Sequence, residues 1–130
     1  MNKNIRILIV DDFSTMRRIV KNLLADLGFT NTAEAEDGSG ALAMLRAESF
    51  DFVVTDWNMP VMDGYTFIQR VRANPRWRNI TLMMVTTESE QGQIVRALAA
   101  GAHEYVIKPF TPDAIVDKLD MLGLVQRGVA

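Results

Sequence analysis

The chain has no cysteine and a single histidine, and these shortages exclude several kinds of site. Among 130 residues there are 0 Cys and 1 His. The chain therefore has no disulfide framework, no thiolate metal centre and no cysteine nucleophile. Without clustered metal ligands around it, His103 is expected to be a loop or surface residue rather than a metal ligand.

An excess of charge and long hydrophobic runs are missing as well. The net charge is -2 and the pI about 5.3, so a broad basic field for nucleic acid or a membrane surface is absent. The apolar run at 7–10 is far too short for a signal-peptide core or a membrane span. We therefore expect a cytoplasmic protein with no nucleic-acid or membrane partner.

Length and composition predict one globular domain. A chain of 130 residues with 48% hydrophobic and 23% charged residues can form one ordinary core. The sequence shows no linker and no low-complexity stretch. We expect a single domain over residues 1–130, with its core over about 5–123 and no output domain.

Short apolar runs alternate with helical patterns along the whole chain. The predicted strands are 6–10, 30–35, 52–56, 80–85 and 105–107. The predicted helices follow them at 16–27, up to 47, 64–73, 89–100 and 112–122. This alternation predicts an α/β fold with a parallel sheet, right-handed crossovers and helices on both faces. The mixed polarity of 30–35 favours an edge strand.

The helix boundaries carry their own signals. Ser14 and Thr15 are candidate N-caps of the first helix, and Thr111 is one for the last. The apolar stripe of the first helix comprises Met16, Ile19, Val20, Leu23, Leu24 and Leu27. The basic residues of that helix, Arg17, Arg18 and Lys21, are interpreted as a solvated face.

Residues 36–38 are predicted to form a turn. The glycine pair at 38 and 40 does not follow the first strand and lacks a third glycine, so a dinucleotide site is poorly supported.

Four of the predicted strands end in residues of matching chemistry. Asp56 ends the strand 52–56 and opens a Pro/Gly-containing turn at 57–64. The other strand ends carry Asp11 and Asp12, Thr86, and Lys108. In a parallel sheet all carboxyl ends emerge at one edge, which is where ligands bind.

Together these strand ends suit phosphoryl transfer. Three converging carboxylates repel one another unless a cation intervenes, and oxygen ligands of this kind suit Mg²⁺. A hydroxyl and an ammonium group would stabilise the negative charge of a phosphoryl group. The inferred chemistry is phosphoryl transfer to a carboxylate, with Asp56 as the nucleophile.

Each residue also has an ordinary interpretation. Asp56 could start a turn, Asp11 and Asp12 could cap a helix, Thr86 could be a strand-end hydroxyl and Lys108 a surface lysine. Their joint placement at one edge favours the functional interpretation.

The complete set resembles the receiver domain of two-component response regulators. The matching stretches are Asp11-Asp12, residues 56–64, Thr86 and residues 108–110, which together cover essentially the whole chain in order. The chemotaxis members are the most similar, through residues 12–18 and 105–111. The resemblance implies a flavodoxin-like (βα)5 fold with strand order 2-1-3-4-5. It also suggests a stand-alone, monomeric receiver domain.

The resemblance implies a role for each position of the site. Asp56 would accept a phosphoryl group from a histidine kinase, while Thr86 and Lys108 would contact the phosphoryl oxygens. Asp12, Asp56 and the main-chain carbonyl of Asn58 would bind Mg²⁺, and Asp11 would help through water.

Further residues would act around that site. Tyr105 would change rotamer as Thr86 is drawn towards the phosphate, although plain strand packing is the alternative. Asn58 and Glu88 would tune dephosphorylation, and the bond from Lys108 to Pro109 is expected to be cis. Trp57 should report on site occupancy, unless it is a surface anchor.

The resemblance also implies partners, and here the sequence departs from the chemotaxis pattern. The partners would be a chemotaxis-type histidine kinase, the flagellar motor switch and possibly a phosphatase. Residues 89–93 contain no lysine where chemotaxis members often carry one, and Gly92 should weaken the start of the fourth helix. Lys118 is kept, and Met121 stands where another lysine is common.

Three other functions remain open. A single-domain relay would pass the phosphoryl group on to another histidine protein. An aspartate-based phosphohydrolase would use the same residues, but the sequence shows no sign of the cap domain that such an enzyme would need. A flavodoxin-like cofactor binder would need a glycine-rich loop after the first strand, and none is present. We expect a switch that phosphorylates and dephosphorylates itself, not a multiple-turnover enzyme.

Overall fold

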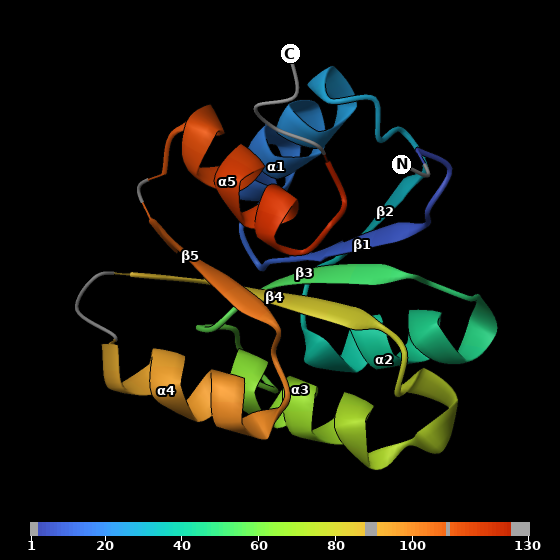
Figure 1. Cartoon of the computed structure of the whole chain (residues 1–130). Helices are drawn as coiled ribbons and strands as arrows, with labels where there is room; N and C mark the ends of the chain where they lie inside the picture. Colours follow the sequence, from blue (N-terminus) through green and yellow to red (C-terminus); the bar gives the residue numbers. More distant parts are fainter. Residues whose placement is uncertain (1–2, 88–90, 109, 126–130) are drawn as a thin grey trace.

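The computed structural model describes residues 3–87, 91–108 and 110–125, and within them strands and helices alternate (Figure 1). The strands are β1 (Ile7–Val10), β2 (Thr32–Ala35), β3 (Phe52–Asp56), β4 (Thr81–Thr87) and β5 (Glu104–Lys108). The helices are α1 (Ser14–Asp26), α2 (Gly38–Ala47), α3 (Gly64–Ala73), the 3-10 helix η1 (Pro75–Trp77), α4 (Gln91–Ala100) and α5 (Pro112–Met121). The predicted alternation is confirmed.

The strands form one parallel sheet in the order β2-β1-β3-β4-β5. β1 pairs with both β2 and β3, so Val10 lies between Ala35 and Thr55. All four residues of β1 are buried, as an apolar strand covered on both faces requires. The mixed-polarity segment is the edge strand β2, which confirms that prediction.

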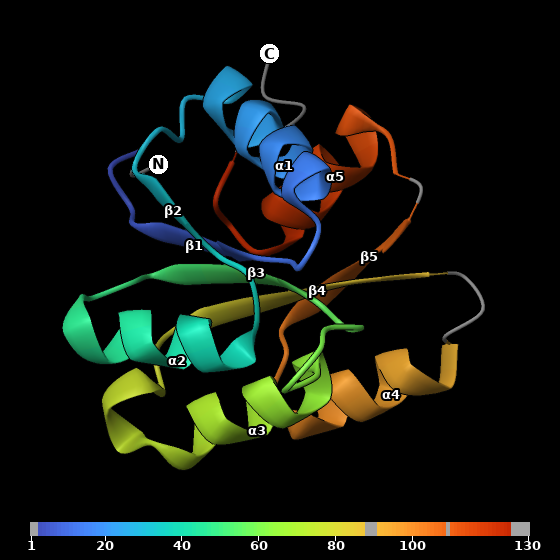
Figure 2. The ribbon, with the colours of Figure 1, turned by 180° about the vertical axis from the view of Figure 1, so that it is seen from behind.

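Helices cover both faces of the sheet. Figures 1 and 2 show α1 and α5 on one face and α2, α3 and α4 on the other. Successive residues of β1 point to opposite faces, so Ile7 and Ile9 pack in the core under α1 and α5, and Leu8 and Val10 in the other core. The carboxyl ends of the strands are left free of these helices at one edge of the sheet.

Side-chain caps fix the start of three helices. The carboxylate of Asp63 accepts a hydrogen bond from the Thr66 N–H at 2.8 Å, and Thr111 caps α5 through the Ala114 N–H. Asp37 caps α2 in the same way, accepting from the Gly40 N–H. The predicted turn at 36–38 was therefore wrong in part, because the Asp37 cap starts the helix already at Gly38.

The start of α1 differs from the prediction. Neither Ser14 nor Thr15 is the N-cap; both lie inside the helix, and Phe13 occupies the cap position without a side-chain hydrogen bond. The backbone N–H of Phe13 donates a hydrogen bond to the Asp11 carboxylate just before the helix. Ile19 does not join the predicted apolar stripe, since it is 43% exposed.

On α4 the burial is narrower than the run of apolar residues. Ile94 and Ala97 are buried, whereas Val95 and Leu98 are 68% and 41% exposed. The predicted start at Ser89 lies outside the described residues, and α4 is described from Gln91. None of the described helices has the length and apolarity needed to cross a bilayer.

Gly64 offers a test of how the sheet edge is packed. A Cβ at this position would meet the Asp56 carbonyl and would lie 2.9 Å from the Cα of Trp57. We expect Gly64→Ala to lower the free energy of unfolding by about 1–3 kcal/mol, because rigid backbone atoms would have to move. Gly92→Ala is the matched control, since nothing lies within 4 Å of its Cβ position. Urea unfolding should leave the control at least as stable as the wild type; equal stability of both variants would contradict this packing.

Candidate functional site

The predicted site residues meet at the carboxyl ends of the central strands. Asp11 follows β1, Asp56 is the last residue of β3, and Thr86 lies near the end of β4. These three residues are buried, whereas Asp12 is exposed. Buried polar groups in the middle of an apolar sheet need partners or a task.

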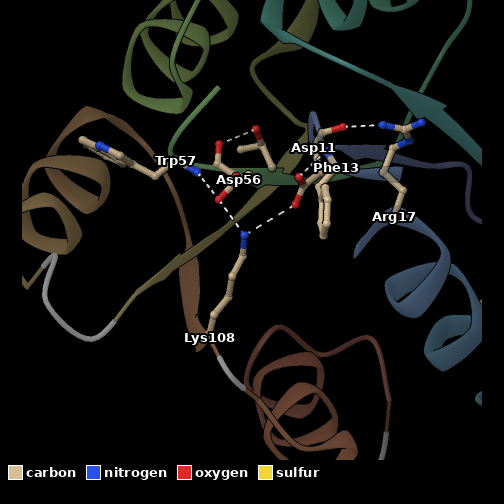
Figure 3. Close-up of polar contacts among 7 residues, drawn as sticks. Asp11, Phe13, Arg17, Asp56, Trp57 and Lys108 are labelled. Atoms are coloured by element: carbon tan, nitrogen blue, oxygen red, sulfur yellow. Dashed lines mark hydrogen bonds and ion pairs between the residues drawn. The ribbon is translucent and has the colours of Figure 1, made fainter. Parts of the chain in front are cut away.

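Lys108 provides the positive charge at this edge (Figure 3). Its Nζ lies 3.1 Å from Asp56 Oδ1 and 3.6 Å from Asp11 Oδ2. Because β4 separates β3 from β5, the long lysine side chain reaches past the end of β4 to both carboxylates. Lys108 is therefore not the solvated surface lysine of the alternative interpretation.

Backbone N–H groups hold both buried carboxylates. Asp11 Oδ1 accepts from the Phe13 N–H and Asp56 Oδ1 from the Trp57 N–H, each at 2.9 Å. The turn after Asp56 is itself closed by the Gly64 N–H, which donates to the Trp57 carbonyl at 2.8 Å. These bonds fix the direction of each carboxylate without engaging all of its oxygen lone pairs.

The acidic residues fit a divalent cation. One carboxylate oxygen from each of Asp11, Asp12 and Asp56 lies within 4.8 Å of the others. Such an all-oxygen, partly exposed cluster suits a hard ion that keeps some of its waters. Asn58 is exposed in the turn after Asp56, and the ligand role of its carbonyl stays a prediction. Glu88 and Pro109, and with them the predicted cis bond, lie outside the described residues.

Burial and like charge perturb the acids. Burial raises the pKa of Asp56 above its ordinary value, although the neighbouring Lys108 opposes that rise. Burial also raises the pKa of Asp11; the Phe13 N–H lowers it and the charge of Asp56 raises it further. The folded protein therefore keeps these negative charges together at a cost, and a bound cation would reduce that cost.

Thr86 contributes a hydroxyl group without a partner. Its side chain is 1% exposed, and its Oγ1 has no hydrogen-bond partner among the described residues. A buried hydroxyl without a partner costs about 1–3 kcal/mol, so proteins retain few of them. This hydroxyl could donate to an oxygen of a group bound at Asp56.

Tyr105 lies near Thr86 on the same face of the sheet. In the register of β4 and β5, Met84 pairs with Tyr105 and Thr86 with Ile107. Since alternate residues share a face, Thr86 and Tyr105 are diagonal neighbours on the side of α3 and α4. Tyr105 is half-buried against that core, so strand packing and a switching role both remain compatible with its position.

Two arrangements escaped the sequence analysis. Arg17 is not solvated, because it donates to the Asp11 carbonyl at 2.6 Å and pairs with Glu34 at 3.0 Å. The spacing of residues within the helix gave no sign of these partners, which lie just after β1 and in β2. Trp57 is buried rather than a surface anchor, and its ring lies 5.6 Å from that of Tyr65.

His103 is exposed, as predicted, but it has a structural contact. Its Nδ1 accepts from the Leu82 N–H at 3.1 Å, next to the guanidinium of Arg72. Burial and this positive charge lower the pKa of His103, which favours the neutral ring that can accept.

Two cavities lie away from the strand carboxyl ends. They have volumes of about 150 and 310 Å³ and share Trp77 in their linings. Neither lining includes Asp56, Thr86 or Lys108, so these two cavities are separate from the acidic cluster.

The family is decided by a match over nearly the whole chain. Residues 7–120 match the family model described as the response regulator receiver domain. The chain belongs to this family. The fold and the family predicted from the sequence are therefore confirmed.

Known receiver domains agree with this assignment. A chemotaxis protein CheY from Pseudomonas aeruginosa is 56% identical over 117 residues, which cover 90% of this receiver domain and 94% of the relative. The solved structure of Vibrio cholerae chemotaxis protein CheY4 is 31% identical, with a TM-score of 0.82, covering 94% of this receiver domain and 99% of that chain. The receiver domain of a P. aeruginosa sensor histidine kinase is 26% identical with a TM-score of 0.78, covering 88% and 93%, and holds a magnesium ion in its active-site cleft.

The burial of Asp56 predicts how the stability of Asp56→Asn, relative to wild type, depends on pH. Because the folded receiver domain holds the Asp56 proton more tightly than the unfolded chain, the stability from this group is complete below its ordinary pKa of 3.8. That contribution is lost as pH rises through the raised pKa. Asp56→Asn does not have this loss, so its stability relative to wild type should increase from about pH 4 towards neutrality.

Urea unfolding without divalent cations, repeated across this pH range, measures the difference. Asp26→Asn, at an exposed position of α1, is the control and should show no comparable increase. If Asp56→Asn instead became less stable than wild type as the pH rose, the ion pair with Lys108 would outweigh the burial of Asp56.

Proposed function

We propose that this receiver domain is a phosphorylation-activated switch of the chemotaxis type, in which Asp56 accepts a phosphoryl group from a histidine kinase. The observation that carries the proposal is the convergence on Asp56 of an ammonium group and two further carboxylates. The Thr86 hydroxyl, on the neighbouring strand, has no partner among the described residues. The kinase partner follows from membership of the family. The proposed location is the cytoplasm, and the proposed active form is a monomer.

The residues of the site fit each part of the transfer. A carboxylate oxygen of Asp56 attacks the phosphorus of a phosphohistidine; the O–P bond forms, the P–N bond breaks, and its electron pair stays on the imidazole nitrogen. Lys108, already 3.1 Å from Asp56, then neutralises a phosphoryl oxygen. The Thr86 hydroxyl, which has no partner among the described residues, donates to another phosphoryl oxygen.

The metal in this proposal is Mg²⁺. Asp12, Asp56 and the Asn58 carbonyl would hold it, with Asp11 bound through water. When bound, Mg²⁺ neutralises the negative charge that develops during phosphoryl transfer. The magnesium ion in the related histidine-kinase receiver domain supports this choice, as do the all-oxygen ligands of this chain.

The switch itself would pass through β4 and β5. Movement of Thr86 towards a phosphoryl group leaves space beside Tyr105, whose ring can then change rotamer. In this proposal Asn58 and Glu88 would set the rate of hydrolysis of the aspartyl phosphate. Because the phosphoryl group turns over on the protein's own aspartate, we propose a switch rather than a multiple-turnover enzyme.

The output partner that we propose is the flagellar motor switch, with a phosphatase as a possible further partner. The 56% identity to a chemotaxis protein supports it. A phosphorelay intermediate that passes the phosphoryl group to another histidine protein is the second candidate. The observation that favours this relay is the absence of lysine from residues 89–93.

Phosphoryl acceptance can be tested by mass. With Mg²⁺ and acetyl phosphate, the wild type should gain one acid-stable, base-labile phosphoryl group, and Asp56→Asn should gain none. Removing Mg²⁺ with a chelator should slow the reaction strongly. Asp51→Asn is the control, because Asp51 is an exposed carboxylate outside the cluster, and it should be modified like wild type. An adduct that persists in Asp56→Asn would refute Asp56 as the acceptor.

The output can be tested with a peptide from the amino terminus of a flagellar motor-switch protein. Beryllofluoride with Mg²⁺ serves as the phosphoryl mimic, and quenching of the buried Trp57 confirms that the site is occupied. We expect the peptide to bind about tenfold or more tightly to the activated protein. An occupied site without a gain in peptide affinity, together with rapid transfer to a histidine phosphotransfer domain, would favour the relay.

A further inference from the structure

Three neighbouring side chains at the free edge of the sheet form a closed set of contacts. Lys118 Nζ of α5 lies 3.0 Å from Glu104 Oε1 of β5. The same ammonium group lies 4.2 Å from the centre of the Tyr105 ring. Glu104 Oε1 also accepts from the Tyr105 N–H at 3.1 Å. Lys118 is thus held by a negative charge and an aromatic ring at once.

This ion pair is better shielded than an ordinary surface pair. The Lys118 and Glu104 side chains are only 21% and 17% exposed. In the pair of Arg6 with Glu48, at 2.9 Å, the corresponding values are 30% and 46%. Shielding from water strengthens both the ion pair and the cation–π contact.

Lys118 and the side chain of Tyr105 come from opposite faces of the sheet. α5 covers one face of the sheet, whereas Tyr105 packs against the core on the opposite face. Since β5 is an edge strand, Lys118 reaches Tyr105 around the free edge of the sheet. The contact is therefore made at the free edge of β5, whereas Thr86 lies on the neighbouring strand β4 on the other side.

We propose that Glu104 and Lys118 form a latch that holds Tyr105 in its resting position and so opposes activation. The latch rests on the proposed function, because it acts on the step in which Tyr105 follows Thr86. Inward movement of the ring breaks the contact with Lys118, so the latch stabilises only the resting state.

The latch predicts that its removal tightens binding of the phosphoryl mimic. We expect Lys118→Met to raise the apparent affinity for beryllofluoride, measured by Trp57 fluorescence in saturating Mg²⁺, by about two- to fivefold. Glu104→Gln should raise it by about twofold, since glutamine keeps an acceptor for the Tyr105 N–H but loses the charge. Urea unfolding of each variant checks that the fold is intact.

Charge separates the latch from a general electrostatic effect. Lys118→Met removes a positive charge and Glu104→Gln removes a negative one, so a long-range effect on anion binding would have opposite signs. The latch predicts tighter binding in both. Glu48→Gln, which removes the same charge as Glu104→Gln from the pair with Arg6, is the control and should leave the affinity unchanged.

The outcomes are distinguishable. Tighter binding in both latch variants, with the control unchanged, supports the latch. Opposite shifts that follow charge, or unchanged affinities beside a normal wild-type response, overturn the latch and leave the proposed function intact. A wild type that shows no response to beryllofluoride and no adduct with acetyl phosphate refutes the proposed function, and the latch falls with it.

Discussion

The structure depends on the way Lys108 holds two buried carboxylates at the end of the sheet. Its ammonium group contacts both Asp56, the last residue of β3, and Asp11, which directly follows β1. Without this charge, two desolvated acids would face each other at the ends of apolar strands, which is strongly unfavourable. With it, the acids remain buried at one edge in an arrangement whose remaining negative charge suits a cation and a phosphoryl group.

Several energetically unfavourable features lie close to this edge. The Thr86 hydroxyl lacks a partner among the described residues. Val61, in the turn after Asp56, has a φ of 69°, a left-handed conformation that is costly for a β-branched residue. Elsewhere the caps of Asp37, Asp63 and Thr111 agree with the local backbone. Such a concentration of unsatisfied or strained groups is typical of a functional site supported by a well-packed scaffold.

The sheet also separates the chemistry from the surface that would report it. The acids and Lys108 lie at the strand ends, while Tyr105 lies two residues back from Ile107, the partner of Thr86. In the proposed switch, a change at Asp56 would cross one strand, β4, to reach the free edge of β5. At that edge Glu104 and Lys118 add contacts from α5, on the other layer of the fold.

The sequence by itself determined the alternation of strands and helices, the bounds of α3 and the residues at the strand ends. These features depend on local patterns: continuous apolar runs, helical spacing, and stop signals such as Asn74-Pro75. The strand order followed from the family resemblance, because periodicity does not specify which strands pair. The convergence of Asp56 and Lys108 could be predicted because parallel strands place all carboxyl ends at one edge.

The tertiary structure decided the features that depend on distant partners. Arg17 is taken up by Asp11 and Glu34, Trp57 is covered by the core that includes Tyr65, and Glu104 meets Lys118 across 14 residues. The local sequence around each of these residues is equally compatible with a solvent-exposed side chain. Side-chain partners across strands and layers are fixed only when the sheet is assembled, so no local pattern could reveal them.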